Sequence, residues 1–294
     1  MKLTKIDAPD FDLALTLGSG QVFHWEKQGE GFVGTIGEKA MYAEQRGAKL
    51  RFSGADSDVI ANYFALDHPL KEICASFPRD AIMNQARDFC CGLRIIRQPK
   101  WECLATFICS SMKQVAHIRQ ISHALRQRYG RSLELSGLSL HAFPTPHRLA
   151  KTSEVALRAC ALGYRAKNLL ATAKLVASDK VNLENLAALS DDELRARLCE
   201  LPGVGAKVAN CVLLFAYERL RAFPIDVWIE RVLREKYFAR KRKLTSRKLR
   251  EFAEAYFAEH GGYAQQYLFH HARMTTRRRG VRRMARLPLR DLSA

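Results

Sequence analysis

The spacing of apolar residues changes near residue 56, and this change limits the possible fold more than any other feature of the sequence. Before it, short apolar runs alternate with glycine-bearing turns, a pattern typical of a small antiparallel sheet. After it, apolar residues recur at helical spacing. The sequence therefore predicts an α+β protein, in which a small N-terminal antiparallel β-sheet domain precedes a mostly α-helical domain.

The predicted elements divide the chain into three parts. The expected strands are 22–27, 31–36, 39–45 and 49–53, and the expected helices are 56–66, 79–91, 101–111, 113–129, 153–162, 165–178, 190–200, 206–220, 227–238, 245–259 and 262–274. We place the sheet domain with flanking helices at 1–97 and the helical domain at 98–274. Residues 275–294 are a basic tail. Because the eight arginines from 273 to 290 have no acid among them, we expect this tail to be loose unless it lies on an anion.

The charge of the chain favours a polyanionic partner. It carries 48 Lys and Arg against 30 Asp and Glu, a formal charge of +18. Nucleic acid is the leading candidate, because basic side chains neutralise phosphates and release condensed counterions. No apolar run approaches the ~20 residues that a membrane-spanning helix needs, so no membrane partner is expected.

The cysteines argue against a bound metal. There are 8, none of them in a C-x-x-C pair, and none follows Cys211. This spacing excludes a zinc ribbon and a C-terminal iron–sulfur cluster. We expect free thiols in a reducing compartment and no metal or other cofactor.

The segment 190–220 predicts a helical hairpin with a glycine turn. Ser190 and Glu193 have the spacing of a capping box, which begins the first helix. Gly203 and Gly205 then allow backbone conformations closed to other residues, and they let the N–H groups at the start of the second helix approach a phosphate. Taken alone, the pattern also fits an ordinary αα-hairpin.

Three residues in and after the hairpin are candidates for chemistry. Lys207 lies in the first turn of the second helix, where the helix dipole disfavours a cation by up to ~1 kcal/mol. Its charge therefore does not stabilise the helix. Cys211 is four residues further on, and it therefore shares the face of Lys207. Asp226 is well placed to cap the helix expected at 227–238, and alone it would be read only as a cap.

The hairpin and several other segments together resemble the helix-hairpin-helix base-excision DNA glycosylases, and among them the 8-oxoguanine DNA glycosylases. The resemblance covers roughly residues 10 to 272, and the absence of a four-cysteine cluster separates this chain from the endonuclease III and adenine-glycosylase branches. The matching segments are LPGVGAKVANC (201–211), PIDV (224–227), SGQVFHW (19–25), the stretch from Glu102-Cys103 to Ser110-Ser111, LGYRA (162–166), and the stretch from Tyr263-Ala264-Gln265 to Phe269.

The resemblance implies a bifunctional DNA glycosylase and AP lyase acting on 8-oxoguanine in double-stranded DNA. Lys207 would attack C1′ of an extruded nucleotide and form a Schiff base, from which the 3′ phosphate leaves by β-elimination. A water nucleophile would stop at the abasic site. Asp226 would stabilise the positive charge that develops on the sugar.

The resemblance also implies a pocket that reads the extruded base. Cys211 and Phe269 would sandwich the lesion, and Gln265 would read its Watson–Crick edge. The carbonyl of Gly20 would accept a hydrogen bond from N7–H. This last contact distinguishes the lesion, because 8-oxoguanine donates at N7 and guanine accepts there.

The chain departs from the family pattern where the DNA should be held. Met112 stands in place of an asparagine that fills the hole left by the extruded base, and His117 replaces one of two arginines that grip the estranged cytosine. Arg165 matches the second arginine, and Tyr164 matches the wedge into the base stack. Because histidine offers fewer donors than arginine, we expect relaxed preference for cytosine opposite the lesion. Trp228 replaces a histidine that contacts phosphate.

Two other functions fit parts of the sequence. A related glycosylase for alkylated bases would not need a lysine that forms a Schiff base, and a non-catalytic hairpin module would bind DNA without turnover. Substitution of Lys207 distinguishes them. We expect a monomer that works in the cytoplasm at the nucleoid if the chain is bacterial, or in the nucleus if it is eukaryotic.

Overall fold

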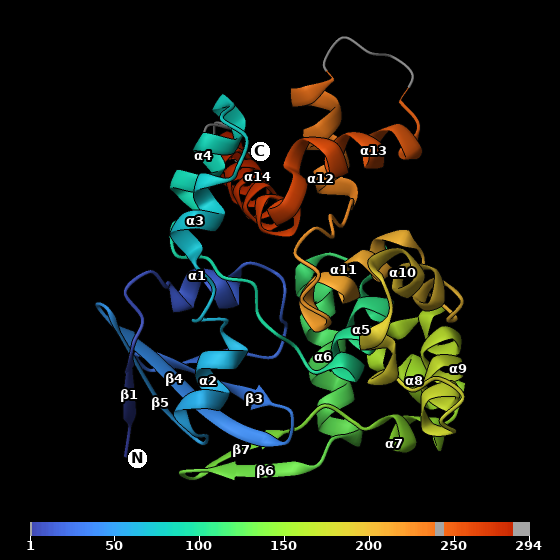
Figure 1. The fold of residues 1–294 in the computed structure, drawn as a ribbon. Coiled ribbons are helices and arrows are strands. Elements are labelled where there is room, and N and C mark those ends of the chain that lie inside the picture. Colours follow the sequence, from blue (N-terminus) through green and yellow to red (C-terminus); the bar gives the residue numbers. More distant parts are fainter. Residues whose placement is uncertain (1, 239–243, 285–294) are drawn as a thin grey trace, which may run out of the picture.

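The chain folds into a small sheet and a larger body of helices, which confirms the predicted α+β class (Figure 1). The structure, a computed structural model, describes residues 2–238 and 244–284, with 277–284 described by their backbone alone. In Figure 1 the sheet lies at the lower left and the helices fill the right and the top. No helix of the described ranges is long and apolar enough to cross a membrane.

The sheet is antiparallel throughout, with the strand order β1-β5-β4-β3-β2. Its strands are β1 (Thr4–Asp7), β2 (Glu26–Gln28), β3 (Gly31–Ile36), β4 (Lys39–Arg46) and β5 (Lys49–Ser53). Of the expected strand at 22–27 only Glu26 and Lys27 form part of a strand, β2, while Val22 and Trp25 bury their side chains from an unpaired segment. A separate hairpin of β6 (Ser132–Leu135) and β7 (Leu138–His141) was not predicted.

The helices largely follow the predicted ranges. They are α1 (Leu13–Gly18), α2 (Ser57–Tyr63), α3 (Leu70–Ala75), α4 (Ala81–Phe89), α5 (Lys100–Ser110), α6 (Val115–Tyr129), α7 (Pro146–Ala150), α8 (Glu154–Leu157), α9 (Arg165–Ala177), α10 (Asp191–Cys199), α11 (Ala206–Ala216), α12 (Val227–Val232), α13 (Ser246–Phe257) and α14 (Gly261–Met284). The short α1, α3 and α7 were not predicted. A further helical turn extends α12 almost to its expected end, whereas the helix expected at 153–162 breaks at Cys160 and Ala161, whose backbone angles are not helical.

The C-terminal part departs from the expectation of a loose tail. Helix α14 was expected to end at 274, but it continues to Met284, so the first part of the tail is helical. The rest of the tail, 285–294, lies outside the described residues. The prediction of a separate tail domain stays a prediction.

Two apolar clusters form the core. One lies between the sheet, α1 and α2, and it includes Trp25, Met41 and Phe52. The larger one surrounds α5 and α11 and extends to α14 through Tyr263 and Tyr267. Helix α4 also packs along α14, so the N-terminal part of the chain contacts its last helix (Figure 1).

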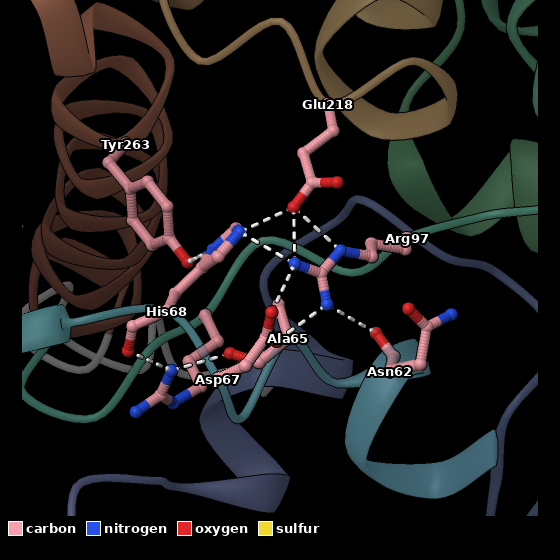
Figure 2. Close-up of polar contacts among 8 residues, drawn as sticks. Asn62, Ala65, Asp67, His68, Arg97, Glu218 and Tyr263 are labelled. Atoms are coloured by element: carbon pink, nitrogen blue, oxygen red, sulfur yellow. Dashed lines mark hydrogen bonds and ion pairs between the residues drawn. The ribbon is translucent and has the colours of Figure 1, made fainter. Parts of the chain in front are cut away.

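A polar cluster, here called the Arg97 network, joins the two parts of the fold. Figure 2 shows Arg97 between Asp67 and Glu218. Its guanidinium donates to Asp67 at 2.6 and 2.9 Å and to Glu218 at 2.6 Å. His68 bridges Glu218 at 2.5 Å and the Tyr263 hydroxyl of α14 at 2.8 Å. Residues from α11's C-terminal end, α14 and the sheet domain are thus fixed to one another.

Candidate active site

The predicted hairpin is formed by α10 and α11. The capping box of Ser190 and Glu193 begins α10, as predicted. Gly203 has φ +83°, and a Cβ atom there would lie 2.8 Å from Cβ of Asn168, so the turn needs glycine both for its conformation and for its close approach to α9. Gly205 is the exposed N-cap of α11 and gives it no side-chain cap. The first N–H groups of α11 therefore remain available to an anion such as a phosphate.

Lys207 lies in the first turn of α11 and its side chain reaches α5. Its Nζ donates to Oγ of Ser110 at 3.1 Å and lies 5.0 Å from the centre of the Phe107 ring. The Ser110 hydroxyl in turn donates to the Phe107 carbonyl at 2.7 Å. Because that bond uses the hydroxyl proton, an oxygen lone pair faces the amine and fixes its position.

Asp226 caps α12, as predicted, and it interacts with Lys207. Its Oδ1 accepts from the backbone N–H of Ile229 at 2.8 Å. Burial raises the pKa of the Asp226 carboxyl, while the Ile229 N–H and the positive charge of Lys207 oppose the rise. A carboxylate and an amine thus act on each other in a partly desolvated corner between α11 and α12.

Cys211 belongs to the same corner. It is buried, and burial raises the pKa of its thiol to about 11, although the charge of Lys207 acts in the opposite direction. The neutral thiol is a small polarisable surface of the kind that a flat ring packs against. The structure thus brings three chemically different groups close together: the amine of Lys207, the thiol of Cys211 and the carboxyl of Asp226.

A second group of predicted residues meets where α14 passes the segment after α1. Gly20 has φ +89°, and a Cβ atom there would lie 3.1 Å from Cε1 of Phe269 and 2.8 Å from Nη1 of Arg273. Two side chains of α14 fix this segment. Gln266 donates to the Ser19 carbonyl at 3.1 Å and Arg273 to the Gly18 carbonyl at 2.5 Å. The positive φ of Gly20 and the nearby ring of Phe269 therefore disfavour a larger residue at this position.

Gln265 is buried without a complete set of partners. Its side chain is 4% exposed, and its Oε1 has no hydrogen-bond partner among the described residues. A buried acceptor that is left unpaired costs roughly 1–3 kcal/mol, so such groups in a native fold call for an explanation. Gln265 lies one helical turn before Phe269 on α14. An incoming ligand with a hydrogen-bond donor would satisfy it.

The residues predicted to penetrate the duplex differ in exposure. Met112 is 91% exposed and Tyr164 is 55% exposed, while His117 lies exposed in the first turn of α6. Trp228 is half-buried in the first turn of α12, with the guanidinium of Arg231 lying 5.6 Å from its ring centre. Arg165, which we expected to reach an estranged base, is instead only 5% exposed.

Three polar residues of the site were missed by sequence reasoning. Ser110 lies in a segment that carried the resemblance, but its contact with Lys207 depends on how α5 packs against α11. Gln266 and Arg273 flank predicted residues on α14, and only the fold shows that they hold the carbonyls before Gly20. No spacing in the sequence signals these long-range contacts.

Two family models together match most of the chain. Residues 3–104 match the N-terminal domain of 8-oxoguanine DNA glycosylase, and residues 105–256 match the HhH-GPD superfamily base excision DNA repair protein. The predicted hairpin and both candidate catalytic residues fall within the second match. The first match also includes the segment 90–99, which links α4 to α5.

Relatives and solved structures agree with these models. An N-glycosylase/DNA lyase of Arabidopsis thaliana is 31% identical over 90% of this chain and 78% of its own length. A probable N-glycosylase/DNA lyase of Methanothermobacter thermautotrophicus is 30% identical over 67% of this chain and 69% of its own. The 8-oxoguanine glycosylase/lyase of Clostridium acetobutylicum, solved with double-stranded DNA containing cytosine opposite 8-oxoguanine, superposes with a TM-score of 0.87 at 30% identity, covering 94% of this chain and 99% of that one.

Proposed function

Since the chain belongs to the HhH-GPD superfamily of base excision DNA repair proteins and carries the N-terminal domain of the 8-oxoguanine DNA glycosylases, we propose that it excises 8-oxoguanine from duplex DNA and then cleaves the strand through a Schiff base on Lys207. The observation that carries this proposal is the Lys207 amine, held by Ser110 at the start of α11 and interacting with the half-buried carboxylate of Asp226.

The glycosylase step uses Lys207 and Asp226. The unprotonated Lys207 amine attacks C1′ of the extruded nucleotide, the bond from C1′ to the base breaks, and the base leaves with the electron pair. The sugar carries positive charge as that bond breaks, and the Asp226 carboxylate stabilises it. The cap on α12 aids this role, because the Ile229 N–H fixes the carboxylate in place.

The lyase step follows from the use of an amine. Once the sugar ring opens, nitrogen and C1′ form a protonated Schiff base, which acidifies the hydrogens on C2′. Loss of one C2′ proton to a base then expels the 3′ phosphate by β-elimination. A water nucleophile offers no such route, because it leaves an intact abasic site.

Cys211 of α11, Gln265 and Phe269 of α14, and Gly20 have the chemistry to hold an oxidised purine. Gly20 supplies a carbonyl for the N7–H of the lesion, and the unpaired Gln265 Oε1 accepts from its Watson–Crick edge. Cys211 and Phe269 pack against the two faces of the ring. An undamaged guanine would set its N7 lone pair against the Gly20 carbonyl, so the contact discriminates by repulsion as well as attraction.

The DNA is held by the turn of the hairpin and by exposed side chains. The N–H groups beside Gly203 and Gly205 bind a backbone phosphate, and Trp228 lies beside the catalytic Asp226 where the strand passes. Met112 fills the space of the extruded base and Tyr164 enters the stack. His117 offers fewer donors to an estranged cytosine than arginine would. The enzyme acts as a monomer on chromosomal DNA, at the nucleoid of a bacterium or in the nucleus of a eukaryote.

Borohydride trapping tests the proposal directly. Wild-type protein incubated with an 8-oxoguanine duplex and sodium borohydride should form a covalent adduct, release free 8-oxoguanine and nick the strand. Lys207→Gln should abolish all three while retaining DNA binding. Excision of oxidised purine that persists in Lys207→Gln contradicts the proposal. The same assays with alkylated bases distinguish a glycosylase that uses water.

Opposite-base preference is tested with four duplexes that differ only in the base facing the lesion. With His117 in place of an arginine, we expect single-turnover rates opposite C, A, G and T to lie within about tenfold of one another, which corresponds to ~1.4 kcal/mol. His117→Arg should raise the preference for C. A strict preference for C in the wild type contradicts this expectation.

A further inference from the structure

Arg165 connects the ends of two helices beneath the exposed Met112 and Tyr164. Its Nε donates to the Ser111 carbonyl at 2.7 Å, and Nη2 donates to the same oxygen. Its Nη1 donates to the Leu162 carbonyl at 3.2 Å. Ser111 is the C-cap of α5, and Leu162 ends the helical turn that follows α8. The guanidinium therefore binds the carbonyl ends of two helices at once.

These carbonyls account for the burial of the charge. Arg165 is 5% exposed, and among the residues whose side chains are described, 2–238 and 244–276, no carboxylate forms an ion pair with it. A buried cation needs compensation, and here the two backbone carbonyls that accept its hydrogen bonds supply it. Releasing the Ser111 carbonyl to reach a base would remove the main compensation for this charge.

The Ser111 carbonyl belongs to the peptide that leads into Met112. Met112 has φ +53°, a left-handed conformation that methionine rarely adopts, and its side chain is 91% exposed. An unusual backbone conformation persists only where the surroundings impose it. The two bonds from Arg165 to the preceding carbonyl fix that peptide and so direct Met112 outward.

Tyr164 is held by the same guanidinium. The Cζ atom of Arg165 lies 4.3 Å from the centre of the Tyr164 ring, while Tyr164 itself is the 55% exposed N-cap of α9. A guanidinium stacked on a ring restricts the rotation of that ring. One buried side chain thus sets the direction of both exposed groups.

Resting on the proposed function, we propose that Arg165 is a positioning residue that orients Met112 and Tyr164 for entry into the duplex, and that it does not read the base opposite the lesion. The two roles differ in their consequences. A positioning residue affects base extrusion whichever base faces the lesion, whereas a reader of cytosine affects one duplex selectively.

The test uses full-length Arg165→Lys and Arg165→Met on duplexes with 8-oxoguanine opposite C, A, G and T. Single-turnover excision should fall about 10- to 100-fold by a similar factor opposite all four bases, because misplacement of groups that organise the site is costly. A loss confined to C, or no loss at all, overturns the proposal. Arg158→Gln is the matched control, since its exposed pair with Glu154 lies on the adjoining α8.

A double-mutant cycle with Met112→Asn supplies a readout that a merely structural role would not move. Asparagine adopts the left-handed conformation more readily than methionine, so it needs less support from Arg165. The fold decrease in excision rate caused by Arg165→Lys should therefore be at least three times smaller in the Met112→Asn background than in the wild type. An equal cost in both backgrounds overturns the proposal. If Arg165→Met does not fold, Arg165→Lys still completes the cycle.

Base extrusion is measured separately with 2-aminopurine placed next to a non-cleavable abasic analogue. Arg165→Lys should lower the fluorescence change on binding, while Arg158→Gln should not. An unchanged signal in Arg165→Lys overturns the positioning role. This readout does not need catalysis, so a wild type that excises no 8-oxoguanine would refute the proposed function without deciding the role of Arg165.

Discussion

The Arg97 network and the candidate active site, meaning here the residues around Lys207, Asp226 and Gln265, differ in how far their polar groups find partners. In the Arg97 network, Asp67 and Glu218 both face the guanidinium of Arg97 (Figure 2). In the candidate active site, Gln265 keeps an acceptor with no partner among the described residues. The carboxyl of Asp226 is half-buried, and Ile229 and Lys207 compensate only part of its desolvation.

The direction of the pKa shift, more than its size, separates the two regions. Hydrogen bonds from His68 and Arg97 lower the pKa of Glu218 to about 2, the mark of a group whose charge is well compensated. Burial raises the pKa of Asp226, the mark of a group whose charge is not. Ion-pair networks that serve only the fold also perturb pKa values, so a shift alone does not identify a site. A polar group whose charge or hydrogen bonds are only partly compensated within the fold can still form interactions with a substrate.

Asp226→Asn should give the largest effect and sharpen the contrast. Asparagine also caps helices, so the fold is kept. Excision should fall about 10³-fold, because the developing positive charge loses its carboxylate. The folded-state pKa is raised, so the ionised form costs stability as pH rises through it. The free energy of unfolding at pH 7 should therefore equal or exceed that of the wild type. A large loss of stability in denaturant titration contradicts this account.

Gln265→Met should produce the next largest effect, about a 100-fold loss of 8-oxoguanine excision. A site built to hydrogen-bond its substrate loses that contact, while the methionine fills a similar volume. Removal of an unpaired buried oxygen should also raise the free energy of unfolding by about 1 kcal/mol. Single-turnover assays and thermal unfolding measure the two changes. If stability falls instead, then Gln265 has a partner within the fold and the contrast fails.

Arg97→Met tests the other region, where the effect should be on stability alone. Breaking the network leaves Asp67 unpaired and Glu218 with His68 alone, and both carboxylates are exposed, so we expect a loss of about 1 kcal/mol. Excision per folded molecule should not change. Because Glu218 has a lowered pKa, its contribution is present above the unfolded pKa and is lost as pH falls toward about 2. The wild type should therefore lose more stability than Glu218→Gln between pH 5 and 2.

The sequence predicted local structure well and distant contacts poorly, and the same two regions show why. The capping box at Ser190 and the cap at Asp226 depend on residues three apart, which a pattern reveals. The strand β1 reads Thr-Lys-Ile-Asp and is mostly exposed, so it has no apolar alternation to detect. The Arg97 network joins residues up to 196 positions apart, from Asp67 to Tyr263, and nothing in the spacing indicates it.

The site divides in the same way. Lys207 and Cys211 share a face of α11, and their spacing of four residues predicts this directly. The burial of Arg165 was not foreseen, because it depends on where α5 ends relative to α9. The family resemblance supplied the identity of candidate residues, but it carries no information on whether a matched arginine points into the groove or into the fold.

Ser110→Ala should give the smallest effect and tests how far the contrast extends. Lys207 would lose its 3.1 Å contact but keep the Phe107 ring, so we expect about a tenfold fall in excision and in borohydride trapping, with DNA affinity unchanged. Ser76→Ala is the matched control, because Ser76 also donates to the carbonyl three residues before it at 2.7 Å and also has a second side-chain partner, His260 at 2.8 Å, but does not contact Lys207. If both variants lose stability and neither loses trapping, then the Ser110 hydroxyl serves only its helix end. A loss of trapping in Ser110→Ala alone would make Ser110 of α5 part of the candidate active site, because its hydroxyl would then fix the position from which the Lys207 amine attacks C1′.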